Sequence, residues 1–168
     1  MKLSVSWFGV VVAAAAMAAT AAPVQAADDP SAQPSGTVFV QTNDAGGNAI
    51  DVFDRNSDGT LTFIRSYATG GNGGREVGAT SDPLASQGSL VRVPGSDLLL
   101  AVNAGSNTIS VFHVAGDSLA LEQVLPSFGP FPVAFGMHGD LVYVLDAGGQ
   151  CFISGYRIVG DALHPIQG

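Results

Sequence analysis

Lysine, tryptophan and cysteine are almost absent from this 168-residue chain. Lys2 and Trp7 both lie near the start, so the rest of the chain has no residue for a lysine Schiff base or a Walker-type phosphate contact. Cys151 is the only cysteine, which excludes an internal disulfide. We expect it to be a small apolar residue buried in a strand, because neither His nor Arg adjoins it to activate the thiol; the alternative is a reactive thiol.

Charged residues are also scarce, at 12% of the chain, while Val, Leu, Ile and Phe are plentiful. This composition argues against intrinsic disorder. After residue 26, no stretch without Gly or Pro exceeds 11 residues. Helices tolerate neither residue well, so helical bundles and coiled coils are excluded and an all-β fold is indicated. The length is typical of about one domain.

Residues 1–26 have the pattern of a secretory signal peptide. Lys2 precedes an apolar run from Leu3 to Thr20, and small residues end in Val24-Gln25-Ala26, which is similar to an A-x-A cleavage site. The alternative is an uncleaved membrane anchor, since the run is just long enough to cross a bilayer. We predict cleavage before Ala27, a disordered leader over 27–35, and a secreted, extracellular or periplasmic protein.

The mature chain is strongly acidic. Once Lys2 is removed, five arginines face fourteen Asp and Glu residues, a net charge of −9. Nucleic acid needs a basic footprint on its partner, and anionic membrane surfaces attract basic segments. The charge therefore disfavours both as partners.

Short apolar runs with period-two alternation recur from Gly36 onward and predict β-strands. The predicted strands form three sets: 37–42, 49–53 and 61–67; 98–103, 108–113 and 119–125; 141–146 and 152–158. One more strand is expected before each of the last two sets, near 88–93 and 131–137. The turns into the third strand of each repeat carry the same residue types, at Asp58-Gly59, Gly116-Asp117 and Gly160-Asp161.

Four strands per repeat of about 45 residues is the spacing of a β-propeller blade. A β-sandwich also has short strands at regular spacing, but it does not require the same Asn- and Gly-containing turns in each repeat. The sequence therefore predicts an incomplete β-propeller of about three four-stranded antiparallel blades over 36–168. The blade boundaries are expected near 36–87, 88–130 and 131–168.

A family resemblance rests on three segments. Leu100–Phe112 (LAVNAGSNTISVF) resembles the V-x-N-x-G-S-N-T-V-S-V-F repeat of YVTN-type propellers. Pro83–Leu90 (PLASQGSL) and Gly139–Leu145 (GDLVYVL) are similar to sequence motifs of the seven-bladed lactonase family of the WD40-like superfamily. That family includes 6-phosphogluconolactonase and carboxymuconate cyclase relatives. The resemblance covers Gly36 to the C-terminus.

The resemblance implies lactone hydrolysis, or the reverse cyclisation, on a small anionic sugar or lactone. Seven blades need roughly 300 residues at about 45 per blade, so either this chain is a fragment or several chains assemble. The family's catalytic groups are expected mainly in blades that the chain lacks, and the chain alone is expected to be inactive. The alternative function is a non-catalytic extracellular binding or scaffold module.

Five residues are candidates for a binding site at the channel mouth. Asn43, Asn103 and Asp146 each end the first strand of a set and are expected on one face with the long loop 69–87. In that loop Arg75 could clamp a carboxylate or phosphate, Glu76 could act as a base, and the glycines of 70–78 could let backbone N–H groups approach an anion. The competing interpretations are Asx side chains that fix turns and a flexible surface loop.

Neither a metal nor another cofactor is expected. The segment 54–59 matches the start of a calcium loop, D-x-N-x-D-G, but the twelfth position is Arg65 and the flanks are strands, so we predict a hairpin turn. His113, His138 and His164 lie far apart and lack the spacing of a zinc site or a hydrolytic triad.

Self-association is expected because the first and third blades each lack a neighbour on one side. Their strands are rich in apolar residues, and exposed apolar faces and unpaired outer strands promote association. Candidates for that exposed surface are Val38, Val40, Val52 and Phe53 in the first unit, and Val142, Val144 and Ile153 in the third. Because side chains alternate along a strand, only some of these are expected to point outward.

Overall fold

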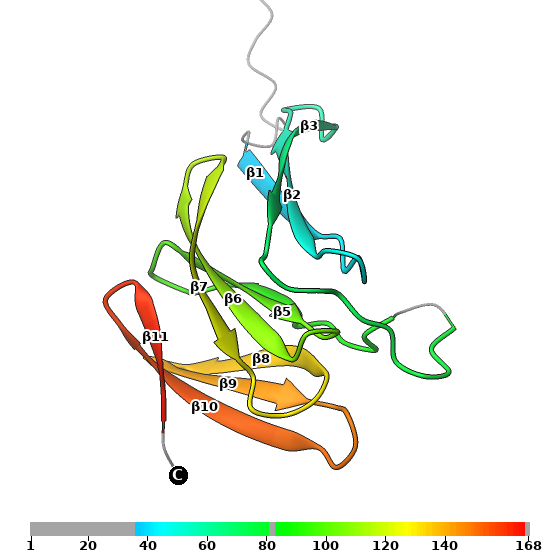
Figure 1. Cartoon of the computed structure of the whole chain (residues 1–168). Coiled ribbons are helices and arrows are strands. Elements are labelled where there is room, and N and C mark those ends of the chain that lie inside the picture. The colour runs from blue at the N-terminus through cyan, green and yellow to red at the C-terminus, as the bar shows by residue number, and fades with distance from the viewer. Residues whose placement is uncertain (1–35, 81–82, 167–168) are drawn as a thin grey trace, which may run out of the picture. The chain divides into compact units, whose positions relative to one another are not determined.

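The computed structural model describes residues 36–80 and 83–166 of the chain. These residues form eleven strands in three antiparallel sheets, and no helix occurs among them (Figure 1). Accordingly, the described residues contain no helix that is long and apolar enough to cross a membrane. The predicted signal peptide and leader, 1–26 and 27–35, lie outside the described residues.

The predicted strands are confirmed, and each sheet is a meander in chain order. The first sheet contains β1 (Gly36–Gln41), β2 (Ala49–Arg55) and β3 (Leu61–Ala68). The second contains β4 (Leu90–Arg92), β5 (Leu98–Asn103), β6 (Thr108–Ala115) and β7 (Ser118–Pro126). The third contains β8 (Pro132–His138), β9 (Leu141–Asp146), β10 (Phe152–Val159) and β11 (Ala162–Pro165).

The internal repeat extends to backbone detail. The turns β2–β3, β6–β7 and β10–β11 each contain a glycine with positive φ: Gly59 at 86°, Gly116 at 64° and Gly160 at 62°. Only glycine adopts such a backbone without strain, which explains the shared turn residues. The register between β2 and β3 shifts between Val52 and Phe53. The register between β6 and β7 shifts at the equivalent position, between Val111 and Phe112.

The central strands of the second sheet, β5 and β6, are buried on both faces. All six residues of β5 are buried, and the five apolar ones alternate between two apolar clusters. Leu99 and Ala101 belong to a cluster with Ile50 and Val52 of the first sheet. The other cluster contains Leu98, Leu100 and Val102 together with Val142, Val144 and Tyr156 of the third sheet. Burial of this kind stabilises a fold by about 1.5–3 kcal/mol per large side chain.

Three successive sheets are thus stacked through alternate faces of the middle one, whereas a β-sandwich would consist of two. β6, which contains Thr108–His113, pairs with β5 and β7 inside its own sheet. The third sheet has its full complement of four strands.

One prediction about burial was wrong. Cys151 is exposed and precedes β10 rather than lying in a strand. Val52, Val142 and Val144 are fully buried, because their alternation directs them toward the second sheet. Val40 and Ile153 are exposed as expected.

Candidate functional site

The loop that follows β3 passes between two of the five predicted site residues, Asn43 and Asn103. The Asn43 side chain holds Gly74 at two points: its Nδ2 donates to the Gly74 carbonyl at 2.8 Å, and its Oδ1 accepts from the Gly74 N–H at 3.0 Å. On the other side, the Gly105 N–H donates to the Asn72 carbonyl at 3.0 Å. The start of this loop is therefore hydrogen-bonded to both neighbouring β-hairpins.

The glycines of this loop permit close packing rather than anion binding. A Cβ atom on Gly73 would lie 2.2 Å from the Asn43 carbonyl group, and one on Gly71 would lie 2.6 Å from the Asn103 amide. The Gly73 N–H donates to the Asp44 carbonyl at 2.8 Å and the Gly71 N–H to the Thr69 hydroxyl at 3.3 Å. These N–H groups already have protein acceptors, so they do not form the open anion-binding loop that the composition suggested.

Arg75 and Glu76 lie further along the loop and are exposed. The Arg75 guanidinium donates to the Ala79 carbonyl in its own loop. The Glu76 backbone N–H donates to the Pro83 carbonyl at 2.7 Å. Both residues thus take part in the local structure of the loop, and these hydrogen bonds do not join either of them to Asn103 or Asp146.

Asn103 is the centre of a buried polar network that links the first two sheets. Its Oδ1 accepts from Asn48 Nδ2 at 2.9 Å, and its Nδ2 donates to the Ser110 hydroxyl at 2.8 Å. The Ser110 hydroxyl in turn donates to the Thr69 carbonyl at 2.7 Å. All four residues are at most 1% exposed. Both polar groups of the Asn103 amide are engaged, so the side chain has a structural role.

The sequence did not reveal Asn48, Thr69 and Ser110 as members of this network. Asn48 follows two glycines and resembles an ordinary turn residue, and its partner lies 55 residues away. The register also corrects the predicted alignment of the three Asx residues. Ile50 pairs with Gln41 as Ile109 pairs with Val102, so Thr42, not Asn43, occupies the position of Asn103.

Asp146 occupies the Asn103 position in the third sheet. Ser110 pairs with Ala101, two residues before Asn103, and Ser154 pairs with Val144, two residues before Asp146. The preceding loops also correspond. Thr69 and Ser127 each donate, through N–H and hydroxyl, to a carbonyl at the start of the second strand, and Gly71 and Gly129 approach Asn103 and Asp146 in the same way.

Unlike the Asn103 amide, the Asp146 carboxylate has no hydrogen-bond partner among the residues that the structure describes. Asp146 is fully buried, and the buried Ser154 hydroxyl also lacks a partner among these residues. Burial raises the pKa of Asp146, and the nearby Ser127 hydroxyl lowers it by a smaller amount. The Ser127 hydroxyl donates to the Gly129 carbonyl at 2.7 Å, so burial determines the direction of the Asp146 shift.

Tyr156 completes this buried group. Its hydroxyl donates to the Pro126 carbonyl, and its ring stacks on Phe128 with the centroids 6.1 Å apart. Burial raises the pKa of Tyr156 to about 12, and the Asp146 charge adds to this shift. The phenol is therefore protonated at neutral pH and cannot act as a base there. The group as a whole offers a carboxyl and two hydroxyls without a cationic side chain among them.

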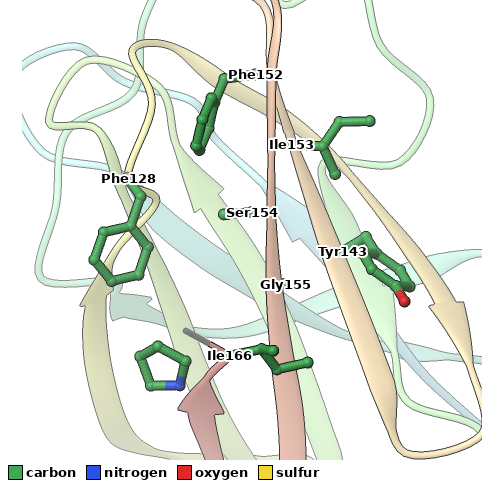
Figure 2. Close-up of a pocket in the computed structure, with 8 residues that line it drawn as sticks. Phe128, Tyr143, Phe152, Ile153, Ser154, Gly155 and Ile166 are labelled. Carbon is green, nitrogen blue, oxygen red and sulfur yellow. The ribbon is translucent and has the colours of Figure 1, made fainter. Parts of the chain in front are cut away.

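An apolar hollow of about 940 Å³ lies at β10, beside this polar group. Figure 2 shows Phe128 and Phe152 on one side of β10, and Tyr143 and Ile153 on the other. Its lining residues are Phe128, Tyr143, Phe152, Ile153, Ser154, Gly155, Pro165 and Ile166. The hollow is suited to apolar contacts and presents no charged side chain.

The other predicted features are separate from these residues. The segment 54–59 contains the end of β2 and most of the β2–β3 turn, in which Asp58 Oδ1 accepts from the Thr60 N–H at 3.0 Å and from its hydroxyl at 2.7 Å. These bonds lower the pKa of Asp58. Within residues 36–80 and 83–166, no group of three or more His, Cys, Asp or Glu side chains is placed to hold a metal ion.

Comparisons with protein-family models, with curated proteins and with solved structures give no match.

Proposed function

We propose that this chain is a segment of a secreted, lactonase-type β-propeller, and that its described part is a non-catalytic extracellular scaffold. The observation that carries the proposal is the engagement of two predicted site residues, Asn43 and Asn103, in internal contacts. Asn43 holds the loop after β3, and Asn103 links the first sheet to the second. Side chains that satisfy each other in this way hold sheets in register and have little capacity left for a ligand.

The propeller part of the proposal is supported by the repeat. Successive antiparallel meanders of three, four and four strands stack through alternate faces. All three have an equivalent glycine turn, and the first two share an equivalent register shift. These features agree with the three sequence segments that resemble motifs of β-propeller blades. In this proposal, activity on a small anionic sugar or lactone would need further sheets to bring a cation and a proton carrier to the same loops.

A double-mutant cycle tests the scaffold role. Asn48→Ala and Asn103→Ala are made singly and together, and the free energy of unfolding is measured by urea denaturation. We expect a coupling energy of about 1 kcal/mol, since each single change leaves the other buried amide without its partner. Asn56→Ala, in the exposed β2–β3 turn, is the control. A coupling energy near zero would contradict the proposed role.

An activity assay tests the competing catalytic function. We expect purified protein to give no turnover of a simple sugar lactone, because groups held by several sheets are needed at one place. Turnover that is abolished by Arg75→Ala would replace the scaffold proposal with a catalytic one. N-terminal sequencing tests secretion separately: we expect the secreted form to begin at Ala27, and a secreted form that retains residues 1–20 would overturn the signal peptide.

A further inference from the structure

The outer face of the third sheet exposes positions that are buried in the second. The strand pairing of the second and third sheets shows which of their residues occupy equivalent positions. Five of these positions lie on the face that points toward the next sheet along the chain. In the second sheet all five are 0% exposed: Leu98, Leu100, Val102, Ile109 and Val111. Their equivalents in the third sheet are Leu141, Tyr143, Leu145, Ile153 and Gly155. Of these, Tyr143 is 42%, Leu145 39% and Ile153 65% exposed.

The first sheet exposes the complementary face. In the second sheet, the face toward the preceding sheet includes Leu99, Ala101, Phe112, Leu119 and Leu121, and the first four of these are buried. The strand registers give their equivalents in the first sheet as Val38, Val40, Phe53, Leu61 and Phe63. Here Val40 is 43%, Leu61 49% and Phe63 56% exposed.

The same pair of faces is buried twice within the chain. The first sheet covers one face of the second, and the second sheet's other face covers the third. In both contacts, the face of the earlier sheet is equivalent to the exposed face of the third sheet. The face of the later sheet is equivalent to the exposed face of the first sheet. Two faces of the same kind never pack on each other there. The chain therefore carries both halves of a contact that it already makes twice.

We propose that the third sheet of one copy packs against the first sheet of a second copy, head to tail. The inference rests on the sheet-stacking role proposed above. The new contact would lack the amide pair of the first junction, because Thr42 and Cys151 occupy the positions of Asn103 and Asn48. It would consequently depend on apolar contact, and a heterologous contact of this kind forms either closed rings or open filaments.

The test uses one substitution on each face of the purified mature protein. Ile153→Arg blocks the third-sheet face, and Val40→Arg blocks the first-sheet face. Sedimentation velocity at micromolar concentration should show self-association of the wild-type protein and a monomer for each variant. Val77→Arg is the matched control, since Val77 is fully exposed in the loop after β3 and belongs to neither face. Circular dichroism and thermal melting check that each variant is folded; if either is not, Tyr143→Arg and Phe63→Arg replace them.

Mixing the two blocked variants gives the decisive result. Val40→Arg retains an intact third-sheet face and Ile153→Arg an intact first-sheet face, so the mixture should form a one-to-one heterodimer. A monomeric wild-type protein would overturn the proposal, as would a mixture that stays monomeric. Association that survives Val40→Arg but not Ile153→Arg would indicate pairing of two third sheets and would also overturn it. None of these outcomes bears on the Asn48–Asn103 coupling, which is measured within one copy.

Discussion

Replacing Asp146 with asparagine is expected to stabilise the protein. At the equivalent position Asn103 uses its Nδ2 group to donate to a serine hydroxyl at 2.8 Å. In the third sheet the carboxylate and the Ser154 hydroxyl are both buried and have no protein partner. An asparagine at 146 can donate to Ser154 as Asn103 does to Ser110, and it removes a charge from a buried position.

The expected gain follows from the cost of a buried, unsatisfied polar group, about 1–3 kcal/mol. At about 3–4 °C per kcal/mol for a domain of this size, the melting temperature at pH 7 should rise by roughly 3–12 °C. Differential scanning calorimetry of both proteins measures the change. Asp161→Asn, in the exposed β10–β11 turn, is the control and should have little effect.

The gain should also depend on pH, with a sign set by the raised pKa of Asp146. In the unfolded chain the carboxyl titrates near its ordinary value of 3.8, and in the folded protein it titrates at higher pH. Wild-type stability from this group is therefore fully present below pH 3.8 and is lost as pH rises through the folded pKa. The advantage of Asp146→Asn should be smallest at low pH and grow toward pH 7.

Ser154→Ala separates this explanation from a general effect of charge removal. In the wild-type background the change should cost little, because the hydroxyl has no partner. In the Asp146→Asn background it should cost about 1 kcal/mol, since it removes the new hydrogen bond. An Asp146→Asn protein that is no more stable than wild type, or whose advantage does not vary with pH, would refute the reasoning.

Three further predictions concern packing and exposure. Gly73→Ala should destabilise the protein by about 1–3 kcal/mol in urea denaturation, because the new Cβ would meet backbone 2.2 Å away, whereas Gly47→Ala has open space and should be nearly neutral. Phe112→Ala should cost about 3–5 kcal/mol, and Phe53→Ala, at the equivalent but partly exposed position of the first sheet, clearly less; equal costs would contradict the assigned burial. Cys151 should react with a thiol reagent in the folded protein at nearly the rate of the unfolded chain, and protection would show that it is covered.

The strands were predictable because their signal is local. Period-two alternation and Asp-Gly turns lie within a few residues of each other, so β5 and β9 have the predicted bounds, 98–103 and 141–146. The burial of Val142 and Val144 was not predictable from the same pattern. Alternation shows that two faces differ, but which face is covered depends on the neighbouring sheet.

The candidate site was predicted less well, because its contacts join distant parts of the chain. Asn103 was identified by its place at a strand end, but its partner Asn48 lies in another sheet. The glycines at 70–74 suggested flexibility or anion binding, since composition cannot distinguish a mobile loop from one whose backbone packs closely on its neighbours. The close approach of the Gly73 backbone to the Asn43 carbonyl, which leaves no room for a Cβ atom, arises only when the chain is folded.

The junctions between sheets form a series in which amide hydrogen bonding declines. Between the first and second sheets, Asn48 donates to Asn103 and Asn103 to a serine. Between the second and third, Asn107 replaces Asn48 and accepts from the Phe131 N–H, while the unpartnered Asp146 replaces Asn103. At the proposed contact between copies, both amides would be lost. Because a buried hydrogen bond adds about 1 kcal/mol and an unsatisfied group costs more, the strength of the junctions should fall in this order. Dilution should therefore separate copies at concentrations where the sheets within each copy stay together, and a single transition in which dissociation and unfolding coincide would show that the series does not determine stability.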